Sequence, residues 1–356
     1  MSLILAINPG STSTKIAVFD NQKQVFLKNI KHSAEELAPF QSITDQYQFR
    51  KNIILHELSD ANIELNNIKA VVGRGGLIKP VRSGIYLINE ALKEDLKKGV
   101  LGQHASNLGG LIADDIAGAL PSATAYIADP VVVDELEPLA RISGHPAFER
   151  ISIFHALNQK AIARAHAKSM GKKYEELNLI VVHLGGGISV GAHKKGMVID
   201  VNQALDGEGP FSPERSGTLP VGAVAKACFS GQYTYDEVKK MITGKGGFVA
   251  YLGTNDAYEV EKRAEAGDEK ARLIHDAMAY QVAKEIGAMS TVLKGQIDGI
   301  LLTGGIAYGK PFVSELKERI AHLGEVFVYP GEDEMRALAL NGLMVLEGEA
   351  MAMEYV

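Results

Sequence analysis

Short apolar runs, each ended by a polar or glycine-rich loop, open the chain and predict a β-sheet. Leu3 to Ile7 stops at Asn8-Pro9-Gly10, as is typical of a buried strand. Apolar and β-branched residues predict further strands over residues 15–20, 25–30, 70–73 and 123–128. The first three strands follow one another without an intervening helix. Apolar residues at helical spacing predict helices over residues 42–60, 89–98 and 105–119.

The second half of the chain repeats the opening pattern. Residues 179–183 predict a strand, Gly185 to Gly187 a tight loop, and residues 188–192 a second strand. Setting Gly10 against Gly185 aligns strand with strand and loop with loop, at an offset of 185 − 10 = 175 residues. This correspondence indicates an internal duplication. The remaining predicted elements are strands over 197–201 and 299–302 and helices over 219–229, 234–242, 268–294, 310–323 and 333–346.

Composition narrows the class of protein. The 356 residues correspond to two domains at about 150 residues each. With 37 basic and 43 acidic residues the net charge is −6, and Lys-rich clusters are only pairs, which argues against a nucleic-acid-binding face. The single cysteine, Cys228, excludes a disulfide framework, and we expect it to be buried. The apolar start is too short for a secretory segment or a membrane span, so we expect a cytoplasmic protein with no membrane partner.

Three glycine loops follow apolar strands and carry the candidate chemistry. They are Asn8 to Lys15, His183 to Gly187, and Thr303 to Ile306. Glycine lets a ligand approach the backbone closely, and successive N–H groups form a concave anion site. The first loop adds the hydroxyl groups of residues 11–14 and the cation of Lys15, which together suit a polyphosphate. A single loop of this kind is also explained as a plain tight turn.

The common nucleotide-binding motifs are absent from the sequence. No Gly-x-x-x-x-Gly-Lys-Ser/Thr string occurs, which excludes a P-loop enzyme. No Gly-x-Gly-x-x-Gly string opens a helix after the first strand, which argues against a dinucleotide-dependent dehydrogenase.

The order of the glycine loops resembles the acetate/butyrate kinase family, within the superfamily of acetate and sugar kinases, Hsp70 and actin. The chain is closest to the butyrate kinase branch around Val72 to Gly76. The resemblance rests on five motifs in the family's order: Asn8-Pro9-Gly10-Ser11-Thr12-Ser13-Thr14-Lys15, Phe154-His155, His183-Leu184-Gly185-Gly186-Gly187, Arg215-Ser216-Gly217 and Gly304-Gly305-Ile306.

The resemblance implies an α/β fold of duplicated actin/ribonuclease H-like domains, with mixed five-stranded sheets flanked by helices and an interdomain cleft. We expect an N-terminal domain over residues 1–150 and a C-terminal domain with the adenosine site over 151–330. Residues 331–356 are expected to form a helix that returns to the N-terminal domain.

The activity that the resemblance implies is phosphorylation of a short-chain fatty acid by ATP and Mg²⁺, giving butanoyl phosphate and ADP from butanoate. A carboxylate, with a pKa of about 4.3, is already ionised at pH 7, so no general base is required. The catalytic problem is to bring two anions together with cations, hydrogen-bond donors and alignment. Branched-chain acids, acetate and propionate remain alternative substrates, and an ATP-switch protein of the actin or Hsp70 kind is the non-enzyme alternative. As for many metabolic enzymes, we expect a homo-oligomer.

The resemblance also assigns roles to individual residues. Arg215 matches the family's transition-state arginine, since a guanidinium grips two oxygens at once; a surface ion pair with Glu214 or Glu208 is the alternative. His155 matches the active-site histidine and is expected to donate to the moving phosphoryl group without becoming a phosphohistidine. Asp129 and Glu334 are the expected magnesium ligands, with Glu332 and Asp333 as competitors for the second position.

The remaining assignments concern the nucleotide and the acyl chain. Arg74 is the expected second active-site arginine, with Arg82 as the alternative, because the acetate branch places its arginine four residues before the glycine pair. Gly73 stands where that branch carries valine, so Gly73 and Phe154 are expected to line the acyl pocket. Phosphate or its metal is expected at Asn8, Ser11, Ser13, Lys15, His183, Gly185, Gly186 and Gly187, and adenosine at Gly304, Gly305 and Ile306.

Overall fold

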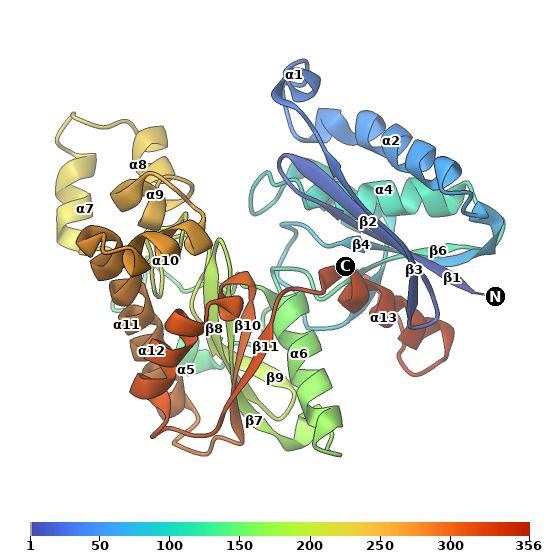
Figure 1. Ribbon diagram of the computed structural model, residues 1–356. Helices are drawn as coiled ribbons and strands as arrows, with labels where there is room; N and C mark the ends of the chain where they lie inside the picture. Colours follow the sequence, from blue (N-terminus) through green and yellow to red (C-terminus); the bar gives the residue numbers. More distant parts are fainter. Residues whose placement is uncertain (1) are drawn as a thin grey trace. The chain divides into compact units, whose positions relative to one another are not determined.

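The computed structural model describes residues 2–356, which divide into two compact units (Figure 1). One unit runs to Val133 and also contains Asp333–Val356, and the other is Asp134–Glu332. The first boundary therefore falls at residue 133, whereas the sequence analysis placed it at residue 150. The reason is that the intervening segment is bonded to the second unit: the Glu137 amide donates to Ile199 O over 2.9 Å, and Arg150 pairs with Asp200 at 3.0 Å.

The first unit is built on a six-stranded sheet in the order β3-β2-β1-β4-β6-β5. The predicted sheet had five strands; the additional one is the three-residue β5, antiparallel to β6. β1 and β2 form an antiparallel hairpin, whereas β1, β4 and β6 are parallel neighbours. The strands are β1 (Leu3–Pro9), β2 (Ser13–Asp20), β3 (Lys23–Lys31), β4 (Ile68–Arg74), β5 (Ile85–Leu87) and β6 (Thr124–Ala128).

Helices cover both faces of this sheet, and strand alternation decides which residues face which helix. α2 and α4 lie over one face and α13 over the other (Figure 1). Leu5 and Val71 belong to the core under α2 and α4. Ile4 and Val72 lie close to Gly342 of α13, on the other face. Asn8 and Arg74 share the parity of Ile4 and Val72 and so lie on the α13 face. The helices are α1 (Ala34–Leu37), α2 (Tyr47–Asp60), α3 (Glu90–Lys98), α4 (Asn107–Gly118) and α13 (Glu334–Leu346).

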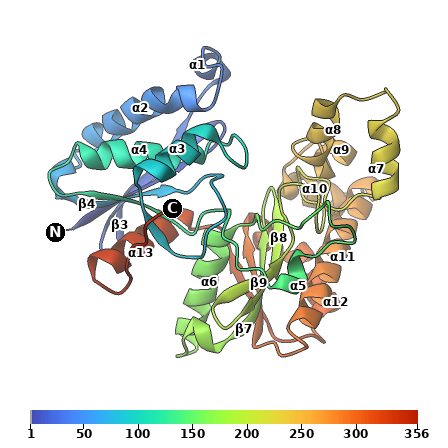
Figure 2. The same ribbon diagram turned by 180° about the vertical axis from the view of Figure 1, so that it is seen from behind.

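The second unit contains a five-stranded sheet in the order β11-β10-β7-β8-β9. α6 covers one face of this sheet, and α11 and α12 cover the opposite face (Figure 2). Leu179 and Val181 belong to the core on the α6 side, whereas Ile180 and Val182 belong to the core under α11 and α12. The elements are β7 (Asn178–Leu184), β8 (Ile188–Lys194), β9 (Met197–Val201), β10 (Gly299–Gly304), β11 (Val326–Pro330), α5 (Pro138–Arg141), α6 (Ala156–Ser169), α7 (Val221–Cys228), α8 (Tyr235–Ile242), α9 (Gly247–Leu252), α10 (Ala257–Glu265), α11 (Glu269–Val292) and α12 (Lys310–Ile320).

The predicted duplication is confirmed by strand bounds and connectivity. β1 and β7 begin 178 − 3 = 175 residues apart, and β2 and β8 begin 188 − 13 = 175 residues apart. Each sheet then continues with two parallel strands beside its opening strand, β4 and β6 in one unit and β10 and β11 in the other. The three-residue loops 10–12 and 185–187 therefore occupy equivalent positions in the two units.

Cys228 is exposed at the end of α7, so the expectation of a buried thiol was wrong. Of the residues that the structure describes, none in α7 or α8 is buried, and these two helices contribute nothing to the core. Across residues 2–356, no helix has the length and apolar character needed to cross a membrane.

Candidate active site

The loop Gly10–Thr12 in the first unit is held by Arg50 of α2. The Arg50 guanidinium donates to Gly10 O over 2.7 Å, to Ser11 O over 3.0 Å and to Ser13 O over 3.0 Å. Gln46 accepts from the same guanidinium over 2.8 Å and fixes its orientation. Arg50 is only 1% exposed, and burial lowers the pKa of its guanidinium to about 10, so it remains charged at neutral pH. The sequence analysis did not identify Arg50.

The carbonyl groups of this loop are occupied by partners inside the protein, whereas two of its amide groups are not. Thr12 O accepts from the His32 amide over 2.9 Å, so the carbonyls of residues 10–13 all have partners inside the protein. The amide groups of Ser11 and Thr12 have no hydrogen-bond partner within residues 2–356, and both residues are exposed. A loop that buries its carbonyls and presents its amides is suited to bind an anion.

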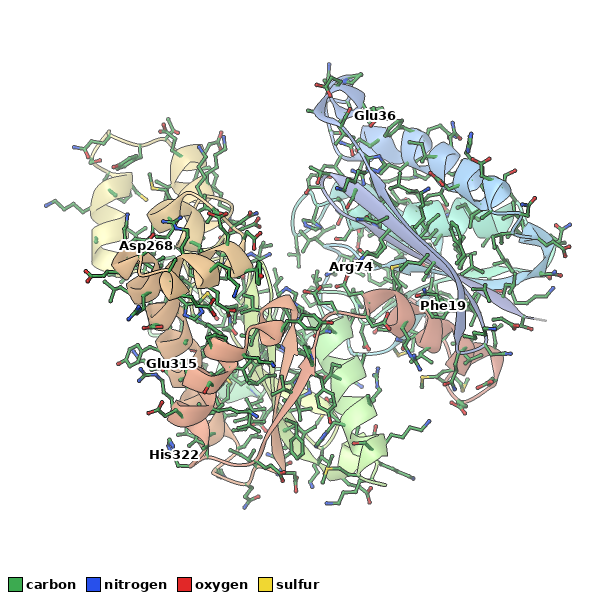
Figure 3. The ribbon with its side chains drawn as sticks, viewed as in Figure 1. Phe19, Glu36, Arg74, Asp268, Glu315 and His322 are labelled. Atoms are coloured by element: carbon green, nitrogen blue, oxygen red, sulfur yellow. The ribbon has the colours of Figure 1, made fainter. Side chains whose placement is uncertain are left out.

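Asn8, Arg74 and Glu334 meet on the α13 face of the first sheet. Figure 3 labels Arg74, which lies near α13. Asn8 Nδ2 donates to Glu334 Oε2 over 2.5 Å, and Arg74 lies 2.8 Å from the same carboxylate. Lys15 pairs directly with Asn8 across the β1–β2 hairpin, so its side chain lies on the same face. Arg82 is exposed and its carbonyl accepts from Tyr86 Oη over 2.8 Å. The structure therefore groups Arg74, not Arg82, with the other predicted residues.

The three acidic residues 332–334 have different partners. Asp333 caps α13 by accepting from the Arg336 amide over 3.0 Å. Glu332 lies 3.3 Å from His183 in the second unit. Only Glu334 joins Asn8 and Arg74, which favours it among the three as a ligand beside the first loop.

Asp129 follows β6 and is 1% exposed, with a positive φ of 37° that aspartate tolerates better than most residues. Its Oδ1 accepts from Ser83 Oγ over 2.6 Å and from the Gly84 amide over 2.9 Å. This oxygen is therefore committed to the loop before β5, and a metal-binding role for Asp129 stays a prediction.

Gly73 lies against the backbone of α4. A Cβ at Gly73 would overlap the carbonyl of Gly109, and a Cβ at Gly109 would overlap the carbonyl of Arg74. The space that a side chain at Gly73 would enter is therefore filled by α4 and is not open to an acyl chain, contrary to the expectation from the sequence. The glycine is explained by close packing of β4 on α4.

The loop Gly185–Gly187 in the second unit lies beside Arg215. A Cβ at Gly187 would overlap the Arg215 guanidinium, whereas a Cβ at Gly186 would lie 3.6 Å from the Glu214 carboxylate. The guanidinium donates to the carbonyl of Ala204, and Ser212 Oγ donates to Gly186 O over 2.6 Å. The predicted arginine and the predicted glycine loop are thus brought together, and Arg215 is not the partner of a surface carboxylate alone.

His155 and His183 stack on each other beside this loop. Their ring centroids are 3.8 Å apart and the ring planes differ by 11°. His155 stands at the N-terminus of α6, and its Nδ1 lies 2.9 Å from Ser189 Oγ. His183 Nδ1 lies 2.8 Å from Asn158 Oδ1 on α6, and a Cβ at Gly185 would lie 2.9 Å from His183 Nε2. Phe154, expected in the acyl pocket, is buried, with 2% of its surface exposed.

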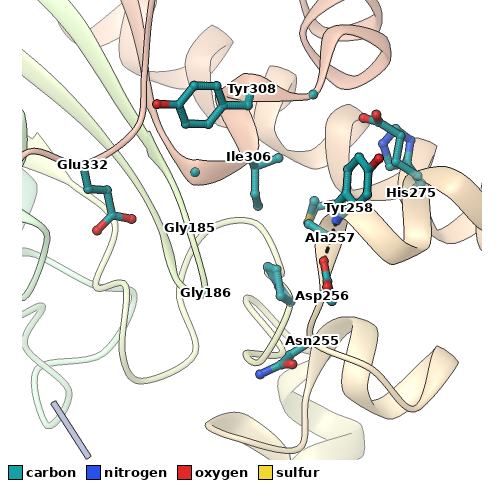
Figure 4. Close-up of a pocket in the computed structure, with 15 residues that line it drawn as sticks. Gly185, Gly186, Asn255, Asp256, Ala257, Tyr258, His275, Ile306, Tyr308 and Glu332 are labelled. Atoms are coloured by element: carbon teal, nitrogen blue, oxygen red, sulfur yellow. Dashed lines mark hydrogen bonds between the residues drawn. The ribbon is translucent and has the colours of Figure 1, made fainter. Parts of the chain in front are cut away.

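A pocket of about 440 Å³ in the second unit joins two of the glycine loops (Figure 4). Gly185 and Gly186 form one end, Gly305 and Ile306 line another wall, and Tyr258 and Tyr308 supply aromatic surface. Gly304 has a positive φ of 91°, and a Cβ there would overlap the backbone of Leu184, so the loop depends on glycine at this position. The volume lies within the usual range for small-ligand sites, roughly 300–1,000 Å³.

Comparison with known proteins identifies the family. The model of the acetokinase family matches residues 150–329. Butyrate kinase 1 of Clostridium acetobutylicum is 58% identical over 355 residues, with 100% of both chains covered. The chain belongs to the acetokinase family.

Two solved structures resemble this chain in fold. Acetate kinase from Porphyromonas gingivalis has a TM-score of 0.78 at 18% identity, covering 97% of this chain and 100% of that one. A propionate kinase from Francisella tularensis has a TM-score of 0.75 at 20% identity, covering 96% and 99%. These likenesses confirm the predicted duplicated actin-like fold of this acetokinase-family member.

Two features of this acetokinase-family member were not predicted, although the sequence contains a signal for each. Tyr308 stands two residues after the predicted adenosine motif Gly304-Gly305-Ile306, whereas Tyr258 stands 304 − 258 = 46 residues before that motif and had no such signal. β11, missed as a strand, is a β-branched and aromatic run ended by Pro-Gly. Arg50 had no comparable signal, because an arginine within a helix is ordinarily a surface residue.

Proposed function

We propose that the protein is a butyrate kinase, which transfers the γ-phosphoryl group of ATP to butanoate and releases butanoyl phosphate and ADP. The observation that carries this proposal is the grouping of Arg215, His155 and His183 around the loop Gly185–Gly187. One cation and two imidazole rings beside a glycine loop are groups suited to stabilise a transferred phosphoryl group, and this supports the proposal. The full-length similarity to butyrate kinase 1 supports butanoate as the acid.

The nucleotide is proposed to bind with its adenosine in the pocket of the second unit. Gly305 and Ile306 line that pocket, and Gly185 and Gly186 stand at the end from which the phosphates would extend. Gly304 would shape this wall without touching the nucleotide. Within the first unit, we propose a separate anion site suited to phosphate groups, made by the amides of Ser11 and Thr12, the hydroxyl groups of Ser11 and Ser13, and Lys15.

Magnesium fits the oxygen donors beside the first loop. Glu334 offers a carboxylate that accepts from Asn8 Nδ2, and the Asn8 amide oxygen lies 3.4 Å from Arg74 on the same face. Mg²⁺ uses one or two carboxylates together with water and phosphate oxygens. Among residues 2–356, no three His, Cys, Asp or Glu side chains gather as a metal cage. We propose Glu334 as the protein ligand, with nucleotide phosphates supplying others. The bound ion would neutralise phosphate charge.

Phosphoryl transfer to a carboxylate requires few further groups from the protein. The acid is already ionised, so the cations and donors need only reduce repulsion and align the carboxylate with the γ-phosphorus. Arg215 would grip oxygens of the transferred group, and His155 would donate a hydrogen bond to it. Arg74, which lies 2.8 Å from Glu334, is proposed to orient that carboxylate and to face the incoming acid.

Trapping the acyl phosphate with hydroxylamine tests the proposal. Purified protein is incubated with ATP, Mg²⁺ and single straight-chain or branched acids from C2 to C6, and hydroxamate is measured. We expect the highest kcat/KM with butanoate. Isobutyrate or isovalerate as the best substrate would reassign the acid. The kinase proposal fails if no acid gives hydroxamate above a control without enzyme.

A further inference from the structure

A continuous chain of hydrogen bonds runs inside the second unit and ends on His155. Tyr174 Oη lies 2.6 Å from His193 Nδ1, and His193 Nε2 lies 2.9 Å from Gln159 Oε1. Gln159 Nε2 lies 2.8 Å from Ser189 Oγ, which in turn lies 2.9 Å from His155 Nδ1. The first four side chains are at most 5% exposed, so water cannot readily replace any of these contacts.

One contact fixes the direction of the chain. Gln159 Nε2 also lies 3.0 Å from the backbone carbonyl of Ser189, and a carbonyl oxygen can only accept. The nitrogen of the Gln159 amide must therefore face Ser189, and its oxygen must face His193. Because that oxygen can only accept, His193 carries its proton on Nε2, and its Nδ1 accepts from the Tyr174 hydroxyl. Burial lowers the pKa of His193 well below its usual value, which keeps this ring neutral.

The same reasoning extends to His155. Ser189 Oγ accepts from Gln159 Nε2 and lies 3.5 Å from the His155 amide, which leaves its hydroxyl proton to donate. His155 Nδ1, at 2.9 Å, is the acceptor within reach of Ser189 Oγ. If Nδ1 carried the ring proton, the buried hydroxyl proton of Ser189 would lack an acceptor, which costs roughly 1–3 kcal/mol.

We propose that Gln159 and Ser189, supported by His193 and Tyr174, are positioning residues that hold His155 as the tautomer protonated on Nε2. The catalytic consequence rests on the proposed function. A neutral ring with its proton on Nε2 donates a hydrogen bond to the transferred phosphoryl group, whereas the other tautomer directs a lone pair at phosphate oxygens. The stacked His183 limits rotation of the ring, and Ser189 determines which nitrogen carries the proton.

Nitrogen NMR tests the tautomer without relying on activity. In protein labelled with ¹⁵N-histidine at pH 8.5, a long-range ¹H–¹⁵N correlation spectrum is recorded, and a His155→Asn sample assigns the His155 signals. We expect Nε2 to be protonated and Nδ1 to be unprotonated in the wild type. Ser189→Ala should shift both nitrogens towards a mixture of tautomers, and Gln159→Met, which removes the donor to Ser189, should do so less strongly.

The kinetic readout uses the same variants. Ser189→Ala should lower kcat with butanoate by about 10-fold to 100-fold, as loss of orienting partners does at other sites, with KM for ATP unchanged. Ser290→Ala is the matched control: Ser290 is a buried serine of α11 whose Oγ donates to Gly287 O over 2.7 Å, outside the chain. The control should leave kcat and the His155 signals unchanged.

The outcomes separate the two proposals. A wild-type His155 protonated on Nδ1 overturns the positioning role, as does a His155 tautomer that both Ser189→Ala and Gln159→Met leave unchanged. If the tautomer responds as expected but the wild type gives no hydroxamate with any acid, the positioning role stands and the butyrate kinase proposal falls.

Discussion

At the scale of single residues, Gly187 links the glycine loop to Arg215. The guanidinium fills the space that a Cβ at Gly187 would need, whereas the nearest atom to a Cβ at Gly186 is a Glu214 oxygen at 3.6 Å. Neither glycine has a positive φ, so alanine adds a methyl group without backbone strain at either position. A comparison of Gly187→Ala with Gly186→Ala therefore separates the effect of displacing the Arg215 guanidinium from the general effect of altering the loop.

We predict that Gly187→Ala lowers kcat nearly as much as Arg215→Ala, by about 10²–10³, because both remove a preorganised donor from the transferred phosphoryl group. Gly186→Ala, the control, should change kcat less than about threefold. Steady-state kinetics with butanoate and ATP check this, and thermal unfolding confirms that the variants fold. Equal losses in the two glycine variants would contradict the assigned position of Arg215. A loss in Arg215→Ala confined to KM would assign that residue to ground-state binding.

Glu334 and Asp333 allow a second comparison at this scale. Glu334→Gln removes the charge beside Asn8 and Arg74, so we expect the Mg²⁺ concentration for half-maximal activity to rise about tenfold or more. Asp333→Asn keeps a side-chain oxygen that can cap α13, so it should leave that concentration nearly unchanged. Activity titrated with Mg²⁺ at saturating ATP measures both. A larger effect in the Asp333 variant would reassign the metal ligand.

At the scale of elements, α2 supports the first glycine loop, residues 10–12, through Arg50. Three loop carbonyls depend on one planar guanidinium, and a lysine ammonium cannot match that fork geometry. Most strands, the β-hairpins and most helices could be predicted, because their apolar periods are regular. The helix α6 could not, because its buried side includes Asn158, Gln159, Lys160 and His166 among alanines, which hides the apolar period.

We predict that Arg50→Lys raises KM for ATP by about tenfold and lowers the free energy of unfolding by about 2–3 kcal/mol, since buried carbonyls lose partners. Lys51→Met is the control: Lys51 lies next along α2 and pairs with Asp115 at 2.6 Å instead of with the loop. Urea unfolding and ATP-dependent kinetics are measured on both. An unchanged KM in Arg50→Lys would show that the loop's shape does not depend on this residue.

At the scale of the whole molecule, three buried histidines with lowered pKa values contribute to the pH dependence of stability. Burial lowers the pKa values of His32, His166 and His193; the positive charges of Arg50 and Lys160 add to this at His32 and His193 respectively. The folded protein keeps these rings neutral, whereas the unfolded chain binds protons below its ordinary histidine pKa of about 6.5. The unfolded state thus gains protons as the pH falls, so stability is present above about pH 6.5 and is lost below it.

We predict that the free energy of unfolding decreases between pH 7.5 and pH 5.5, with each histidine adding at most about 1.4 kcal/mol per pH unit. His166→Gln should flatten this slope, whereas His56→Gln, at an exposed position of α2, should not. Urea unfolding at four pH values measures the slope. A stability that increases towards pH 5.5 would contradict the assignment of neutral buried rings.

The family, the duplication and the residue grouping within each unit are consistent with one mechanism, in which the acid attacks phosphorus directly and no residue becomes phosphorylated. The stereochemical course at phosphorus tests this most directly, using ATP made chiral at the γ-phosphorus with three oxygen isotopes and butanoate as acceptor. The account predicts inversion, which a single in-line transfer produces. Retention would indicate two transfers through a phosphorylated residue, such as His155, and would contradict the role given to that histidine as a hydrogen-bond donor.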